Sequence, residues 1–213
     1  MKLLHQRYIE AVLSGPHGLF SRGDVARLAE HVADGVAGAS MLRDLGARSI
    51  VDIGSGGGVP AFPVAIELED ATIDIVESLG WKTDFLLACA CALSLESRVK
   101  VHALRAEEAP AALGRELRDA GIARAVAAPV VVAEYLAPLV RVGGHLVLWS
   151  TAALASMPVS AEAHAALGLG SASVVAAPSP LRSDGVLIVW PRVAPCSERF
   201  PRRTGVAAKR PLR

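Results

Sequence analysis

Two hydrophobic periods alternate along the chain. Short apolar runs that suit strands buried on both faces cover residues 49–53, 72–77, 99–104, 121–123 and 145–149. Between them, apolar residues recur with the period of a helix over residues 60–68, 80–94 and 128–140, and from after residue 108 to about residue 119. Alternating strands and helices predict an α/β fold with a mainly parallel sheet that is covered by helices.

The two ends of the chain depart from this alternation. Residues 1–45 have a helical pattern that breaks at residues 15–18 and resumes at 24–42, where Asp24 can cap the second helix. Residues 171–177 and 185–193 predict a terminal antiparallel hairpin, which brings the sheet to seven strands. We therefore expect a short N-terminal helical segment, residues 1–45, packed on a main domain, residues 46–198, and then a basic C-terminal tail, residues 199–213.

Four glycines in five positions follow the first strand. Asp52 precedes Gly54, Gly56, Gly57 and Gly58, at a turn where the backbone needs positive φ and close approach to a ligand. A carboxylate that binds ribose hydroxyls is expected about 20 residues further on, at the end of the next strand, and Glu77 stands there. The pair predicts a nucleotide-like ligand, and a glycine-rich turn without a ligand is the alternative.

Composition limits the class of protein. The chain of 213 residues is 52% hydrophobic and only 4% aromatic, which suits one α/β domain with alanine-rich helices. Its most apolar window, residues 122–140, contains Arg124, Glu134 and two prolines and is a poor membrane span. The N-terminus lacks the pattern of a signal peptide, so we expect a cytoplasmic protein without a membrane partner. Three cysteines without metal-ligand spacing predict no metal site and reduced, buried thiols.

The net charge of +1 hides an asymmetry. The last fifteen residues carry six basic groups and no acid, so the remaining chain holds 16 basic and 21 acidic residues, a net charge of −5. A cationic tail on an acidic body can anchor a polyanion, and a solvated, partly disordered terminus is an equally good interpretation. RNA binding is expected of Arg199, Arg202, Arg203, Lys209 and Arg210, with Phe200 available to stack on bases.

The spacing of the glycines distinguishes between nucleotides. Gly54-x-Gly56-x-Gly58 departs from the G-x-G-x-x-G of dinucleotide-binding folds and resembles motif I of the class I S-adenosylmethionine (SAM) methyltransferases. In that family the glycine turn passes under the amino-acid end of SAM, and the acid after the second strand holds the ribose. The resemblance implies the Rossmann-like class I methyltransferase fold and SAM as cofactor.

Six segments, in order, resemble one narrower family. Residues 31–34 are similar to R-H-x-x-D-S, residues 51–63 to V-D-I-G-S-G-x-G-F-P-G-x-P, and residues 76–86 to V-E-S-x-x-K-K-x-x-F-L. Residues 105–108 are similar to R-A-E-E, residues 124–140 to S-R-A-V-A with P-L-L, and residues 200–212 to Y-P-R-x-x-G-x-P-x-K-x-P-L. These are motifs of the RsmG family, also called GidB, the bacterial 16S rRNA guanine-N7 methyltransferases. The resemblance implies SAM-dependent methylation of guanine N7 in small-subunit rRNA. We expect the protein to be a monomer.

The resemblance also implies roles for single residues. The cofactor-binding set it gives is Asp52, Gly54, Gly56, Gly58, Val59, Glu77, Ala106, Glu107 and Arg124. For Glu107 an acid in the first turn of a helix is an equal alternative, and for Arg124 the alternative is a salt bridge. Guanine N7 has a free lone pair and loses no proton, so the site needs positioning and no catalytic base.

The chain departs from the family in three places. The N-terminal W-N-K-x-x-N-L-T stretch is barely recognisable in residues 16–21, Trp149-Ser150 replaces a usual K-G, and the strand before Arg124 is weakly hydrophobic. These departures keep two rivals open: a SAM methyltransferase with another substrate, and an RNA-binding protein that has lost activity. A nicotinamide dehydrogenase is disfavoured, because its glycine spacing and second domain are absent.

Overall fold

The computed structural model describes residues 1–157 and 159–212. Within these residues one seven-stranded sheet has the order β3-β2-β1-β4-β5-β7-β6. Its strands are β1 (Ser49–Ile53), β2 (Thr72–Glu77), β3 (Val99–Ala103), β4 (Arg118–Arg124), β5 (Val140–Thr151), β6 (Ser173–Ala176) and β7 (Gly185–Pro191). The first five are parallel, and β7 pairs antiparallel with both β5 and β6. The predicted fold class, a mostly parallel sheet with a terminal antiparallel hairpin, is confirmed.

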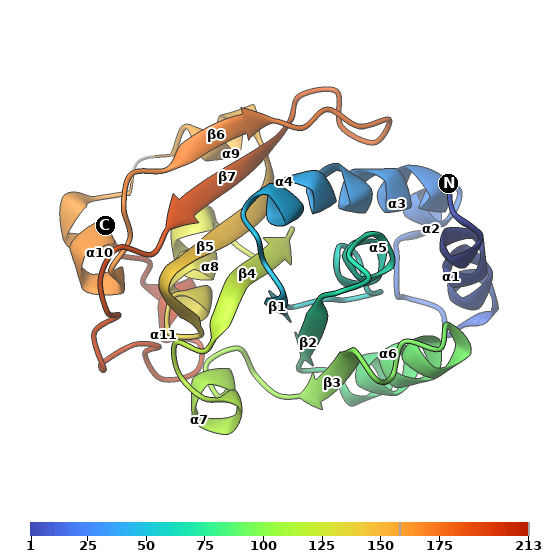
Figure 1. Ribbon diagram of the computed structural model, residues 1–213, viewed down its shortest axis with the longest axis horizontal. Helices are drawn as coiled ribbons and strands as arrows, with labels where there is room; N and C mark the ends of the chain where they lie inside the picture. Colours follow the sequence, from blue (N-terminus) through green and yellow to red (C-terminus); the bar gives the residue numbers. More distant parts are fainter. Residues whose placement is uncertain (158, 213) are drawn as a thin grey trace.

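Helices cover both faces of the sheet (Figure 1). One layer holds α1 (Leu3–Ser14), α3 (Leu28–Ala37), α5 (Ala61–Glu67) and α6 (Gly80–Ala92), with α2 (Arg22–Val25) and α4 (Ala39–Asp44) at the ends of α3. The other layer holds α7 (Ala109–Leu113), α8 (Pro129–Leu136) and α10 (Ala161–Leu167). Successive residues of β1 point to opposite faces, so Ile50 and Val51 belong to different hydrophobic cores.

Several predicted boundaries were wrong. The helix predicted for residues 128–140 ends at Leu136, and β5 already begins at Val140. The helix predicted for residues 24–42 is three helices, with Gly38 between α3 and α4. The predicted helix up to residue 119 ends at Leu113, because Gly114 has φ +86°, and β4 already begins at Arg118. The polar start of this strand is satisfied by neighbours: Arg118 pairs with Asp74 at 2.7 Å, and Asp119 accepts the backbone N–H groups of residues 48 and 49.

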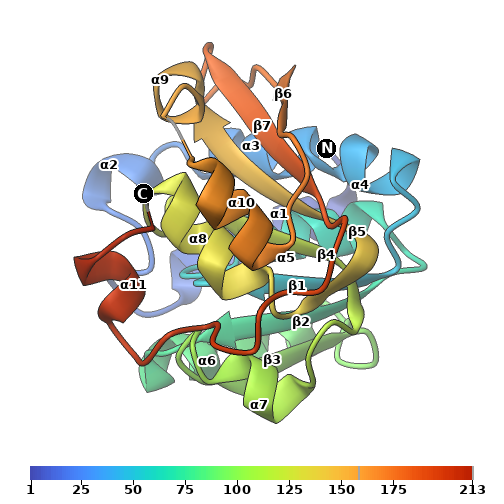
Figure 2. The same ribbon diagram turned by 90° about the vertical axis from the view of Figure 1, so that its left-hand side faces the viewer.

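The C-terminal segment is folded onto the main sheet domain (Figure 2). It includes the short helix α11 (Val206–Lys209), which contacts α8. Phe200 is 1% exposed and packs in the core beneath α8. Arg202 binds the buried carboxylate of Glu134 through Nη2–Oε2 at 2.6 Å and Nε–Oε1 at 2.8 Å. Phe200 is therefore not available to stack on bases, and that expectation was wrong.

The described helices are all too short to cross a membrane. The longest helix, α6, has 13 residues, and no helix within 1–157 and 159–212 combines the length and apolarity needed to cross a bilayer.

Candidate functional site

A cavity of about 510 Å³ opens at the carboxyl ends of the parallel strands. Its floor is the glycine turn after β1, together with Glu77 at the end of β2 and Arg124 at the end of β4. Leu19 and Phe20, from the loop before α2, form part of its wall. Ligands of open α/β sheets bind at this edge, where neighbouring loops diverge.

The turn after β1 adopts the conformation that its glycines permit. Gly54, Gly56 and Gly58 have φ values of +70°, +58° and +101°, a region that other residues rarely adopt. No atom lies within 4 Å of the place where a Cβ of Gly56 would stand, so this glycine leaves open space on the cavity side. The N-terminal helix supports the turn from behind, because the buried Tyr8 hydroxyl donates to the Gly57 carbonyl at 2.6 Å.

Glu77 is 7% exposed and is held by two backbone groups. Its Oε2 accepts the Gly56 N–H and its Oε1 accepts the Leu79 N–H, each at 3.0 Å. A carboxylate offers about four acceptor sites, so two remain free on a side chain that already lines the cavity. The structure therefore fixes the position of this acid and leaves capacity for hydroxyl donors.

Asp52 lies directly under the turn, fully buried. Burial raises the pKa of its carboxyl to about 7, although the Ser55 hydroxyl, which donates to Oδ2, and the charge of Arg124 both lower it. Oδ1 has no hydrogen-bond partner among the described residues. A buried acceptor without a partner is costly when ionised, which agrees with the raised pKa of this carboxyl.

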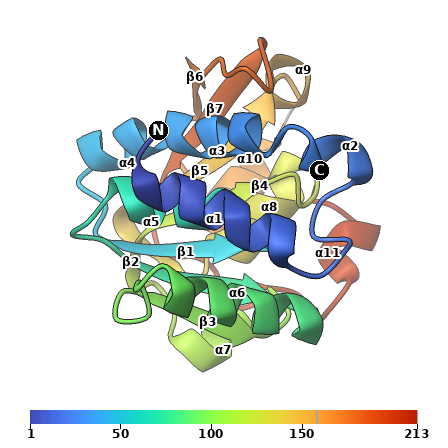
Figure 3. The same ribbon diagram turned by 90° about the vertical axis from the view of Figure 1, so that its right-hand side faces the viewer.

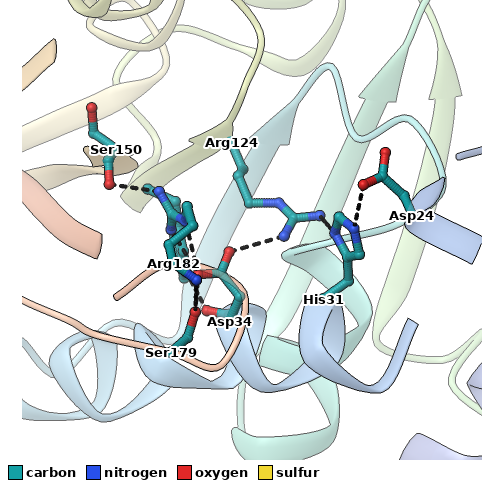
Figure 4. A network of polar contacts seen from close by, with 8 residues as sticks. Asp24, His31, Asp34, Arg124, Ser150, Ser179 and Arg182 are labelled. Carbon is teal, nitrogen blue, oxygen red and sulfur yellow. Dashed lines mark hydrogen bonds and ion pairs between the residues drawn. The ribbon is translucent and has the colours of Figure 1, made fainter. Parts of the chain in front are cut away.

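Arg124 anchors a chain of polar contacts along one wall of the cavity (Figure 4). Its Nη1 donates to Asp34 Oδ2 at 2.9 Å, and its Nη2 lies 3.1 Å from His31 Nδ1. His31 Nε2 lies 3.2 Å from Asp24 Oδ1. Burial and the nearby guanidinium lower the pKa of His31, which favours the neutral ring, so Nδ1 accepts from Arg124 and the proton stays on Nε2.

Asp34 is the centre of this network. It is 0% exposed, and its Oδ1 accepts from Arg182 Nη2 at 2.8 Å and from Ser179 Oγ at 2.9 Å. The Asp34 carbonyl also accepts the Trp149 indole N–H at 2.7 Å. Asp34 thus joins α3 to β5 and to the loop before β7, from parts of the sequence more than 100 residues apart.

The sequence identified only part of this network. Arg124 belongs to the predicted cofactor-binding set. His31 and Asp34 lie in the segment that resembles R-H-x-x-D-S, but the sequence predicted no role for them. Arg182 and Ser179 were missed, because they lie in a turn-rich loop whose pattern carries no sign of a distant partner. A buried acid on an apolar helix was the available signal, since such a group requires a cation.

Several predicted residues lie outside the cavity wall. The cavity is lined by Gly54, Gly56, Val59, Glu77 and Arg124. Asp52 and Gly58 instead lie behind the turn. Ala106 and Glu107 are half-buried at the start of α7, and Glu107 Oε1 accepts the Gly205 N–H at 2.7 Å. Arg199, Arg203, Lys209 and Arg210 are exposed on the C-terminal segment. No cluster of three potential metal ligands occurs within the described residues.

Solved structures of known enzymes share this architecture. A putative O-methyltransferase from Klebsiella pneumoniae matches with a TM-score of 0.62 at 16% identity, over 91% of each chain. Mitomycin 7-O-methyltransferase matches with a TM-score of 0.59 at 12% identity, over 90% of this chain and 69% of that one. The fold is that of a class I methyltransferase.

Sequence comparisons narrow the class to a family. The family model described as GidB, rRNA small subunit methyltransferase G, matches residues 4–175. The enzyme named ribosomal RNA small subunit methyltransferase G from Rubrobacter xylanophilus is 39% identical over 87% of this chain and 73% of its own length. Its counterpart from Prochlorococcus marinus strain MIT 9313 is 41% identical over 78% of this chain and 68% of its own. The chain belongs to the ribosomal RNA small subunit methyltransferase G (GidB) family.

Proposed function

We propose that this methyltransferase transfers a methyl group from SAM to N7 of a guanine in the RNA of the small ribosomal subunit. The observation that carries the proposal is the cavity that brings together the glycine turn, Glu77 and Arg124 in a chain of the GidB family. Glu77 and the turn suit a nucleoside, and Arg124 suits an acceptor with an oxygen edge.

The cavity fits SAM by three observations. Its volume of about 510 Å³ lies within the usual range for small-molecule sites. Open space beside Gly56 lets the backbone approach the ligand, and Glu77 keeps free acceptor capacity for ribose hydroxyls. Asp52 is fully buried behind the turn, so its part in the proposal is to hold the turn through Ser55 and not to contact the ligand. When bound, SAM supplies an electrophilic methyl group.

The protein's own contribution is positioning and exclusion of water. The lone pair of guanine N7 is free at neutral pH, so no proton is removed before attack. Arg124 is held on two sides by Asp34 and His31 and can donate to the guanine O6 edge without reorganising. Leu19, Phe20 and Leu148 supply apolar parts of the cavity wall, which help to exclude water from the reacting atoms.

The RNA contact is proposed for the exposed basic groups of the C-terminal segment, Arg199, Arg203, Lys209 and Arg210. Arg202 anchors this segment to Glu134 and is engaged in that pair. In Figures 2 and 3 α2, beside the cavity, and α11 lie on the same side of the molecule. The proposal includes a monomer that acts in the cytoplasm, where small-subunit RNA is assembled.

Titration calorimetry and methyl transfer test the proposal together. We expect the purified protein to bind SAM and to transfer labelled methyl to small-subunit RNA from cells that lack the native enzyme, with the label recovered as N7-methylguanine. Glu77→Gln removes the charge and one acceptor, and we expect at least a tenfold loss of SAM affinity. Glu96→Gln, an exposed acid outside the cavity, is the control.

Each alternative function has its own outcome. SAM binding without transfer to RNA favours a methyltransferase with another acceptor, for which the replacement of K-G by Trp149-Ser150 is the sequence argument. RNA binding without SAM binding favours an inactive RNA-binding protein. The absence of both overturns the proposal.

A further inference from the structure

One exposed aromatic side chain lies beside the cavity. Trp81, the second residue of α6, is 42% exposed, whereas Trp149 and Trp190 are 4% and 3% exposed. Its ring approaches the loop before α2, because a Cβ on Gly18 would lie 3.7 Å from Trp81 Cη2. The same loop continues directly into Leu19 and Phe20 of the cavity wall. The indole therefore lies beside residues of the cavity wall, with Lys82 on one side and the loop of Leu19 and Phe20 on the other.

Two cations without ion-pair partners accompany this indole. Lys82 lines the cavity, and its Nζ lies 5.4 Å from the centroid of the Trp81 ring. Arg22 is exposed and borders the neighbouring groove of about 520 Å³ together with His17. Neither Lys82 nor Arg22 takes part in the ion pairs found over residues 1–157 and 159–212. The exposed acids nearest in sequence are Asp84, one turn further along α6, and Asp24, which faces His31.

We propose that Trp81 is a stacking platform for an unpaired base that flanks the target guanine, with Lys82 and Arg22 contacting the adjoining phosphates. This inference rests on the proposed function and adds an RNA contact to it. An aromatic face bordered by cations is complementary to single-stranded RNA, which offers bases to stack and phosphates to neutralise. Lys82, whose Nζ lies 5.4 Å from the ring centroid, adds a positive charge that an anionic strand can neutralise.

The geometry also indicates where the nucleotides next to the target guanine lie. A guanine that enters the cavity leaves its neighbours in the strand outside, because the cavity volume suits one nucleoside cofactor and one base. The neighbouring nucleotide then lies over the rim formed by Trp81 and Lys82. The segment V-E-S-x-x-K-K that residues 76–82 resemble has lysine where this chain has Trp81, so the aromatic ring is a departure from that motif.

Substitution of Trp81 tests the contact by kinetics. Trp81→Ala is expected to raise the KM for unmethylated small-subunit RNA by about 5- to 150-fold, the usual effect of losing one stacked base. The affinity for SAM and the kcat at saturating RNA stay unchanged, since Trp81 is not among the residues that line the cavity. Trp81→Phe keeps a ring and is expected to restore most of the affinity. Leu87→Ala, a 52% exposed residue on the same helix, is the matched control.

Fluorescence gives a second, direct measurement. Because the other two tryptophans are buried, acrylamide quenches mainly Trp81 in the free protein. Added RNA is expected to shield this component from acrylamide, and Trp81→Phe is expected to remove the RNA-dependent part of the signal. Shielding reports contact even if a variant proves too unstable for kinetics.

The outcomes separate the inference from the proposed function. If the wild-type protein does not methylate RNA, the proposed function fails. If it does, but Trp81→Ala leaves the KM for RNA unchanged or RNA leaves Trp81 open to acrylamide, the stacking contact is refuted. If Trp81→Ala raises the KM for assembled subunits and not for protein-free RNA, the Trp81 surface contacts a ribosomal protein. That result also overturns the inference.

Discussion

At the scale of single residues, the site depends on buried charges whose partners come from distant parts of the chain. Asp52, Asp34 and Glu134 are each 0% exposed. Asp34 and Glu134 each hold a guanidinium, whereas Asp52 has only a hydroxyl and a distant cation. A buried carboxylate without an adjacent cation is expected to take up a proton, and this is the origin of the raised pKa of Asp52.

Asp52 should make the stability of the protein depend on pH. Its folded pKa of about 7 lies above the ordinary value of 3.8, so between these values the native state binds more protons than the unfolded state. The contribution is therefore fully present below pH 4 and is lost as the pH rises toward 7. We expect a loss of a few kcal/mol, since one unit of pKa shift corresponds to about 1.4 kcal/mol.

Chemical unfolding of the wild-type protein and Asp52→Asn between pH 4 and 8 measures this effect. Asn keeps an acceptor for the Ser55 hydroxyl and cannot ionise, so the stability of the wild type relative to the variant should fall over this interval. A difference that is constant with pH would contradict the assignment.

Asp34 should be among the residues most sensitive to substitution. Asp34→Ala leaves the guanidinium groups of Arg124 and Arg182 without their shared carboxylate, and breaking a buried ion pair costs about 3–5 kcal/mol. Denaturant unfolding checks the value, and Asp44→Ala, at an exposed helix end, should change stability by less than about 0.5 kcal/mol. A loss no larger than that of the control would show that Asp34 does not stabilise the network.

At the scale of elements, the break between α3 and α4 is matched to one side chain on β5. The ring of Trp149 occupies the space where a Cβ of Gly38 would stand, and its indole N–H binds the last turn of α3 through the Asp34 carbonyl. Trp149 stands in place of a lysine in the motif that the chain resembles. Gly38 and Trp149 thus form a complementary pair that explains how this departure is accommodated.

Substitution of Gly38 tests this pairing. Gly38 has φ −91°, which alanine adopts freely, so Gly38→Ala acts only through overlap with Trp149, and we expect a loss of about 1–3 kcal/mol. Trp149→Leu should relieve the overlap, so the double variant should lose less than the sum of the single ones. Gly80→Ala, where no atom lies within 4 Å, is the control. Additive losses would refute the pairing.

Sequence patterns predicted the elements with strong local signals and missed those that depend on distant contacts. β1, β2 and the glycine turn follow from β-branched runs and glycine chemistry, and all three stand where they were expected. The start of β4 was wrongly predicted as the end of a helix, because nothing local to the polar Arg118 and Asp119 indicates their partners, Asp74 and the N–H groups before β1. The break at Gly38 depends on a ring 111 residues away. Such contacts have no local signature.

At the scale of the whole molecule, the C-terminal segment joins the fold to its proposed substrate. Its inner side is fixed by Phe200, by Arg202 on Glu134 and by the Gly205 N–H on Glu107. Its outer side presents exposed basic groups and no acid from Arg199 onward. A fixed segment holds these charges in one place relative to the cavity, which a disordered tail would not do.

The salt dependence of RNA binding should distinguish the two sides of this segment. Replacing Arg199, Arg203, Lys209 and Arg210 with Gln removes up to four phosphate contacts, and each contact to single-stranded RNA contributes about 0.7 to the slope of log K against log salt. We expect the slope to fall by up to about 3, with the stability unchanged. Arg202→Gln should instead destabilise the fold, because Glu134 stays buried without its partner.

The control pair Arg48→Gln and Lys100→Gln removes exposed cations at the opposite, amino edge of the sheet. If this control lowers the slope as much as the C-terminal variant does, charge alone explains binding and the segment has no special place in it.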